Sequence, residues 1–148
     1  MSIYTQTIQG VYTALPSAVR TATQTLAGKD IIDPNNSNAR FASGINPEVS
    51  GIAVYLNVTA APGVETLQLK LQEQDPASGI WSDVTGAATS ATTATGMVRL
   101  KLKQAITTIA ASATQVQVQD TLPAIWRVLV VHSAGGNWTY SLGVVLYN

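Results

Sequence analysis

The sequence predicts an all-β protein that folds as a single β-sandwich, jelly-roll-like, with an extended N-terminal arm. Apolar and polar residues alternate with a period of two in several segments, as they do in strands with one buried face. Clusters of Gly, Pro, Asn and Asp separate these segments, as in sandwiches and jelly rolls. Charged residues make up only 11% of the 148 residues, so threonine, serine, glutamine and asparagine must cover much of the surface. Threonine-rich surfaces suit pleated sheets.

The alternation is clearest in residues 52–58, 67–71 and 98–103. Each of these segments reads as a strand that buries one face. Residues 125–132 are almost continuously apolar, which predicts a central strand covered on both faces. Further strands are expected at residues 20–26, 116–118 and 140–146.

Turn-forming residues bound these strands. They occur at residues 33–36, 61–63, 75–79 and 134–137. In the segment 75–79, proline presets φ and glycine supplies a positive φ, as a turn requires. Residues 86–96 are small and predict a loop. Residues 104–115 fit either a short helix or an irregular crossing, and we favour a long loop because the threonine pair weakens the helix.

The first 17 residues predict an arm, and residues 18–148 the sandwich domain. The arm mixes threonine and glutamine with apolar residues that have no obvious core position. Such an arm can add a strand to the edge of a neighbour's sheet, although a locally packed or frayed terminus is the alternative. The side chains that we expect to anchor the arm in a partner are Ile3, Tyr4, Ile8, Val11 and Tyr12.

The charge balance argues against a nucleic-acid partner. Lysine and arginine together equal aspartate and glutamate, so the formal net charge is zero, whereas nucleic-acid binding requires a basic patch. The nearest approach is Arg99, Lys101 and Lys103, which we interpret as the solvated face of a strand. No apolar run reaches the length of a membrane span, and the first residues lack the features of a secretory signal.

Catalytic and metal-binding patterns are weak, and we expect neither enzymatic activity nor a cofactor. His132 is the one histidine, and its neighbour Ser133 would point to the opposite face of the strand. Asp30, Asp33, Asn35 and Asn36 supply the oxygen ligands that Ca²⁺ prefers. Their spacing does not match an EF-hand loop, and turns are generally rich in Asp and Asn. A turn is therefore the preferred interpretation.

The three tryptophans could form a platform for stacking sugars. Trp126 and Trp138 lie in strongly apolar segments, where core or interface packing is the expected role. Trp81, beside the turn at Gly79, is the plausible exposed ring.

Four separated blocks resemble a family of small tailed-bacteriophage virion proteins, of the capsid decoration or cement type. The blocks are GIAVYLNVTAAPG (residues 51–63), DPASG with Trp81 (residues 75–81), LPAIWR running into VLVVH (residues 122–132) and TYSLG (residues 139–143). The resemblance covers residues 45–148. The N-terminal segment and residues 101–114 depart from the family pattern.

The resemblance implies a virion structural protein on the outside of an icosahedral capsid, made in the host cytoplasm. Its partner would be the phage major capsid protein, and a homotrimer would suit the local threefold positions of the lattice. The alternatives are a tail or baseplate component, and a carbohydrate-binding module that uses Trp81.

Overall fold

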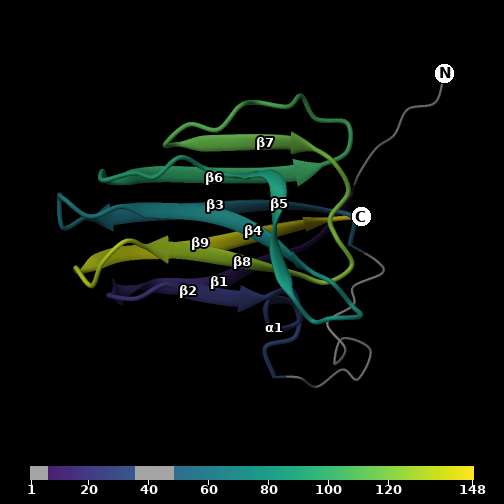
Figure 1. The fold of residues 1–148 in the computed structure, drawn as a ribbon, viewed down its shortest axis with the longest axis horizontal. Coiled ribbons are helices and arrows are strands. Elements are labelled where there is room, and N and C mark those ends of the chain that lie inside the picture. The colour runs from purple at the N-terminus through teal and green to yellow at the C-terminus, as the bar shows by residue number, and fades with distance from the viewer. Residues whose placement is uncertain (1–6, 36–48) are drawn as a thin grey trace.

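Two β-sheets pack against each other in the computed structural model, which describes residues 7–35 and 49–148 (Figure 1). The predicted all-β sandwich is therefore confirmed. The elements are β1 (Ile8–Arg20), β2 (Gln24–Ala27), α1 (Gly28–Ile32), β3 (Gly51–Ala60), β4 (Leu67–Gln74), β5 (Trp81–Ala88), β6 (Gly96–Lys103), β7 (Gln115–Gln119), β8 (Trp126–His132) and β9 (Trp138–Tyr147).

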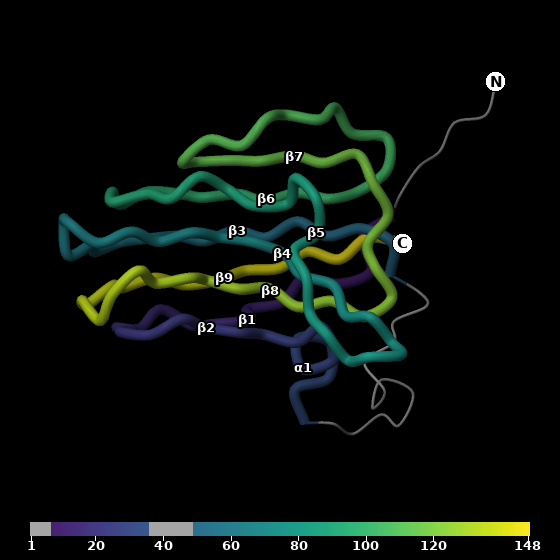
Figure 2. Tube along the Cα trace, viewed as in Figure 1, coloured from purple at the N-terminus to yellow at the C-terminus, as the bar shows by residue number. Residues whose placement is uncertain are grey.

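The chain crosses repeatedly between the two sheets, although β4 and β5 share one sheet and β6 and β7 share the other. The five-stranded sheet has the order β1-β9-β3-β6-β7, and the four-stranded sheet has the order β2-β8-β4-β5. Neighbouring strands are antiparallel, except that β7 runs parallel to β6. The tube in Figure 2 shows how each sheet is assembled from segments that lie far apart in the sequence.

The core lies between the sheets, because each central strand points every second side chain inward. In β9 the buried residues alternate with half-buried ones along the whole strand. The largest buried rings, Trp126, Trp138 and Tyr140, come from β8 and β9. Burial of each large apolar side chain contributes roughly 1.5–3 kcal/mol. The prediction that Trp126 and Trp138 serve packing is confirmed.

The N-terminal segment differs from the predicted arm. Residues 8–20 form β1, which pairs with β9 along its length, so the expected domain boundary between residues 17 and 18 falls inside a strand. Tyr12, Ala14 and Leu15 pack against the core, and this contact holds the segment to its own domain. The predicted anchors Ile3 and Tyr4 lie outside the described residues.

Three further elements differ from expectation. The predicted strand at residues 20–26 is divided between β1 and β2, and the short helix α1 follows it. The strand β5 extends to Ala88, into the segment predicted as a loop. Residues 104–114 form no helix and cross irregularly to β7, in agreement with the long loop predicted there.

The turn at residues 75–79 forms as predicted. The Asp75 carboxylate accepts hydrogen bonds from the Ala77 amide at 2.9 Å and from the Ser78 hydroxyl at 2.8 Å. These bonds hold the pKa of Asp75 below its usual value. Gly79 supplies the positive φ of 75°. Within the described ranges, no helix is long and apolar enough to cross a membrane.

Candidate partner-binding surface

The strand β1 presents apolar side chains to solvent. Ile8 is 63% exposed, Val11 73% and Val19 62%. Scattered single apolar residues are normal on a surface, but these three share one edge strand. Two of the predicted anchors, Ile8 and Val11, are therefore accessible. Val19 was missed because its segment was assigned to the sandwich rather than to the arm.

Tyr12 is placed differently from Ile8 and Val11. Its side chain is half-buried and packs against the core. The ring also lies over Gly10, where an added Cβ would meet the Tyr12 ring carbon Cε2 at 2.6 Å. We therefore assign Tyr12 to positioning the strand, and not to the surface that a partner would meet.

Within residues 7–35 and 49–148 no strand pairs with the outer edge of β1, which we call the open edge, whereas the opposite edge of the same sheet is covered. At that opposite edge, the Ile109 amide donates to the Gln117 carbonyl at 3.0 Å, and the Gln117 amide donates to the Ile109 carbonyl at 3.1 Å. The Gln119 amide donates a hydrogen bond to the Thr108 hydroxyl at 3.2 Å. In contrast, β1 pairs only with β9 among the described strands. An open edge can accept a further strand.

Part of β1 is irregular, which limits where another strand could pair. Register shifts against β9 follow Ile8, Thr13 and Leu15, and Pro16 has no amide hydrogen to donate. The Arg20 guanidinium donates to the carbonyls of Pro16 and Tyr140, each at 2.6 Å. The longest stretch of the edge with an uninterrupted register is therefore residues 10–13.

A polar cluster joins the two sheets near the end of β8. The hydroxyl of Tyr140 and Nε2 of His132 lie 2.8 Å apart, and Arg20 lies 4.9 Å from the centre of the Tyr140 ring. Burial raises the pKa of Tyr140 to about 12. Burial also lowers the pKa of His132; the carboxylate of Glu65 opposes this effect and Arg20 adds to it.

The hydrogen bonds in and around this cluster hold neighbouring segments of the chain together. The Ser133 hydroxyl accepts a hydrogen bond from the Thr66 amide at 2.8 Å, and His132 is bonded to Tyr140 instead. Glu65 accepts a hydrogen bond from the Gly136 amide at 2.7 Å. Each group is thus used in joining a loop or strand to its neighbour.

Trp81 borders a small pocket. The Arg127 guanidinium lies 4.3 Å from the centre of the Trp81 ring, so one face of the ring is covered. The pocket has a volume of about 230 Å³ and is also lined by Lys29, Gln74 and Trp126. An aromatic ring beside amide and ammonium groups can bind a small polar molecule.

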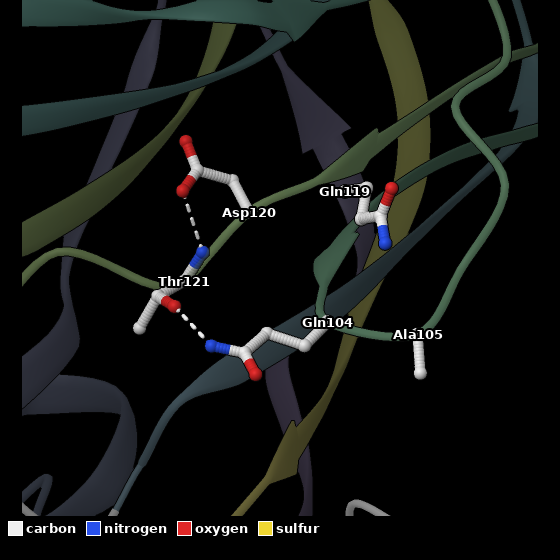
Figure 3. A pocket seen from close by; sticks show the side chains of 5 residues that line it. All are labelled: Gln104, Ala105, Gln119, Asp120 and Thr121. Carbon is white, nitrogen blue, oxygen red and sulfur yellow. Dashed lines mark hydrogen bonds between the residues drawn. The ribbon is translucent and has the colours of Figure 1, made fainter. Parts of the chain in front are cut away.

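A larger depression of about 470 Å³ lies between the ends of β6 and β7 (Figure 3). Its polar groups are bonded to each other: Gln104 donates to the Thr121 hydroxyl at 2.6 Å, and the Thr121 amide donates to the Asp120 carboxylate at 2.7 Å. A lone carboxylate among amides offers no pair of groups for acid–base chemistry.

Of the Asp and Asn residues that were weighed as calcium ligands, and interpreted instead as a turn, those that the structure describes belong to α1 and the turn after it. Asp30 lies in α1, and Asp33 ends it, where the Asp33 amide donates to the Lys29 carbonyl at 2.9 Å. Asn35 follows, and Asn36 is outside the described residues. In residues 7–35 and 49–148, no three His, Cys, Asp or Glu side chains gather as metal ligands do.

Comparison with known proteins adds no family to this picture: no family model matches the chain, and the search of curated proteins gives no match.

Proposed function

We propose that the protein is a virion structural protein that decorates and stabilises an icosahedral phage capsid by binding the major capsid protein. The observation that carries the proposal is the open edge of β1, with Ile8 and Val11 exposed beside it. The four sequence blocks that resemble phage decoration proteins supply the class of partner. On this proposal the protein lies on the capsid exterior and has no catalytic role.

The order of the strands supports a jelly-roll fold, which is common among viral capsid domains and lectins. If β7 is set aside, the sheets have the orders β1-β9-β3-β6 and β2-β8-β4-β5. Two Greek keys folded over each other produce this interleaved order. In this scheme β7 is an added edge strand.

The edge of β1 can act in either of two ways. A capsid segment could pair with residues 10–13 as an additional strand, with apolar side chains in pockets beside it. Alternatively, Ile8, Val11 and Val19 could pack into an apolar groove. On this proposal each copy is a homotrimer at a local threefold position. Many copies on one lattice raise the overall affinity without new contacts. Binding to the folded shell alone stabilises it by mass action.

The test is co-sedimentation of the purified protein with undecorated phage heads. We expect saturable binding and a higher temperature of head disruption. The double variant Ile8→Ser/Val11→Ser should bind at least about 10-fold more weakly, because truncating interface anchors typically costs more than 1 kcal/mol each. Val64→Ser is the matched control, since Val64 is 88% exposed in a distant loop.

Failure of the wild-type protein to bind heads would reject the capsid proposal. Binding to purified tails instead would favour the alternative of a tail or baseplate component, which could use the same edge. Circular dichroism of each variant checks that the fold is retained.

A carbohydrate-binding module is the second candidate, and the pocket beside Trp81 favours it. Glycan-array binding that disappears in Trp81→Ala would support this function. The same array signal in Trp81→Ala and wild type would reject the pocket as the binding site.

A further inference from the structure

The outer face of the five-stranded sheet is positively charged. The strands β1, β9, β3, β6 and β7 contain no aspartate or glutamate. Of their four basic residues, Arg99, Lys101 and Lys103 face outward, whereas Arg20 lies over the buried Tyr140 ring. The other described residues contain three basic and seven acidic side chains. A chain with zero formal net charge therefore separates its charges in space.

The register of β6 places three cations on one face. Val98, Leu100 and Leu102 are buried in the core, so the alternating residues Arg99, Lys101 and Lys103 point to the opposite side of the sheet. Residues two apart on a strand lie roughly 6.5 Å from each other. The cations thus form a column of like charges along β6.

Two rows of side chains connect this column to β1 and β7. The first row runs Val11, Val145, Ala53, Lys101 and Gln117, and the second runs Thr13, Gly143, Tyr55, Arg99 and Gln115. From β1 to β7 the first row therefore changes from apolar to cationic and then to amide, and within it Ala53 is fully buried whereas Val11 is exposed. The exposed Val11 of the candidate surface belongs to this same face.

Aromatic rings, and the lack of counter-ions within the part of the chain that the structure describes, distinguish the face from an ordinary solvated strand. The Lys103 ammonium lies 4.4 Å from the centre of the Tyr147 ring, which holds this cation against the sheet. Among the described residues, neither Arg99 nor Lys101 forms an ion pair; the ion pair that is formed, Lys70 with Asp83, lies on the other sheet. Protein surfaces usually intersperse both signs of charge.

We propose that this face docks an acidic surface of a partner protein, with carboxylates opposite the β6 column and apolar groups against Val11 and Tyr55. The identification of that partner as the capsid protein rests on the proposed function, whereas the preference for carboxylates does not. Tyrosine and arginine are enriched in protein interfaces. Three cations are also fewer than the 6–10 phosphate contacts of a strong nucleic-acid site.

The experiment measures binding to immobilised poly-L-glutamate and to undecorated phage heads, between about 50 and 500 mM salt. The test variant is Arg99→Gln/Lys101→Gln, which leaves Lys103 on its ring. The control is Lys29→Gln/Lys70→Gln, which removes the same charge from outside the five-stranded sheet. We expect the test variant to bind either probe about 2- to 30-fold more weakly, as two exposed charge pairs allow, and the control to match wild type.

Each outcome bears on one proposal. Equal binding of wild type and the test variant to poly-L-glutamate, or equal losses in test and control variants, overturns the docking face. Tighter binding to a DNA duplex than to poly-L-glutamate, lost in the test variant, overturns the protein partner and indicates nucleic acid. Binding to poly-L-glutamate that behaves as expected, without binding to heads, supports the face and rejects the capsid proposal.

Discussion

The hydrogen bond between His132 and Tyr140 should stabilise the sandwich measurably, because it joins strands of different sheets. The change Tyr140→Phe removes only the hydroxyl, and the ring, which is fully buried, remains. Breaking the 2.8 Å bond leaves a partly buried imidazole nitrogen without its partner, which costs about 1–2 kcal/mol. With a urea m-value of about 2 kcal/mol/M, the midpoint of unfolding falls by about 0.5–1 M.

Urea denaturation at pH 8, where His132 is neutral, provides the assay. Tyr147→Phe is the matched control: it too removes a tyrosine hydroxyl, one with no hydrogen-bond partner in the described part of the chain, and it should change the free energy of unfolding by less than about 0.5 kcal/mol. In a His132→Ala background, Tyr140→Phe should lose about 1 kcal/mol of its effect. Equal effects of Tyr140→Phe in both backgrounds would refute the inter-sheet bond as the cause.

Two further predictions concern stability. The pKa of His132 is lower in the folded chain than its usual 6.5, so the unfolded chain binds more protons below that pH. The free energy of unfolding should therefore fall as the pH drops through 6.5. In a series of denaturation curves, His132→Gln should flatten this fall. In Gly28→Ala, the added Cβ would lie 2.6 Å from Cε2 of the buried Trp126 ring; overpacking should destabilise by about 1–3 kcal/mol, and an unchanged midpoint would show that the ring moves freely.

The strands with regular alternation could be predicted from the sequence, because each has one face in the core. β3, β4, β6 and β9 all bury every second residue over most of their length. β5 escaped prediction because Gly86, with a φ of 77°, shifts the alternation, so that its buried residues Val84 and Ala87 are three apart.

β1 was interpreted as an arm for a different reason. Its outward residues Ile8, Val11 and Val19 are apolar but exposed, so the apolar positions of this strand do not mark its buried face. The register shifts and Pro16 interrupt the period further. A sequence pattern cannot distinguish an apolar residue that faces solvent from one that faces the core.

The charged face shows a second limit of the sequence. Arg99, Lys101 and Lys103 were recognised as one face of a strand, and the structure agrees. Their neighbours Tyr55, Val145 and Gln117 come from distant segments. That the strands next to the column contain no carboxylate therefore depends on topology, which local spacing does not encode.

The covered edge at β7 also has a consequence for assembly. A sheet with two free edges can be extended from both ends, and identical copies can then stack into a filament without limit. Here the loop bonds from Ile109 and Thr108 block extension at β7, so the five-stranded sheet can grow only beyond β1. Edge pairing through this sheet therefore ends after a single partner, so crowded copies of the chain cannot extend this sheet into a filament.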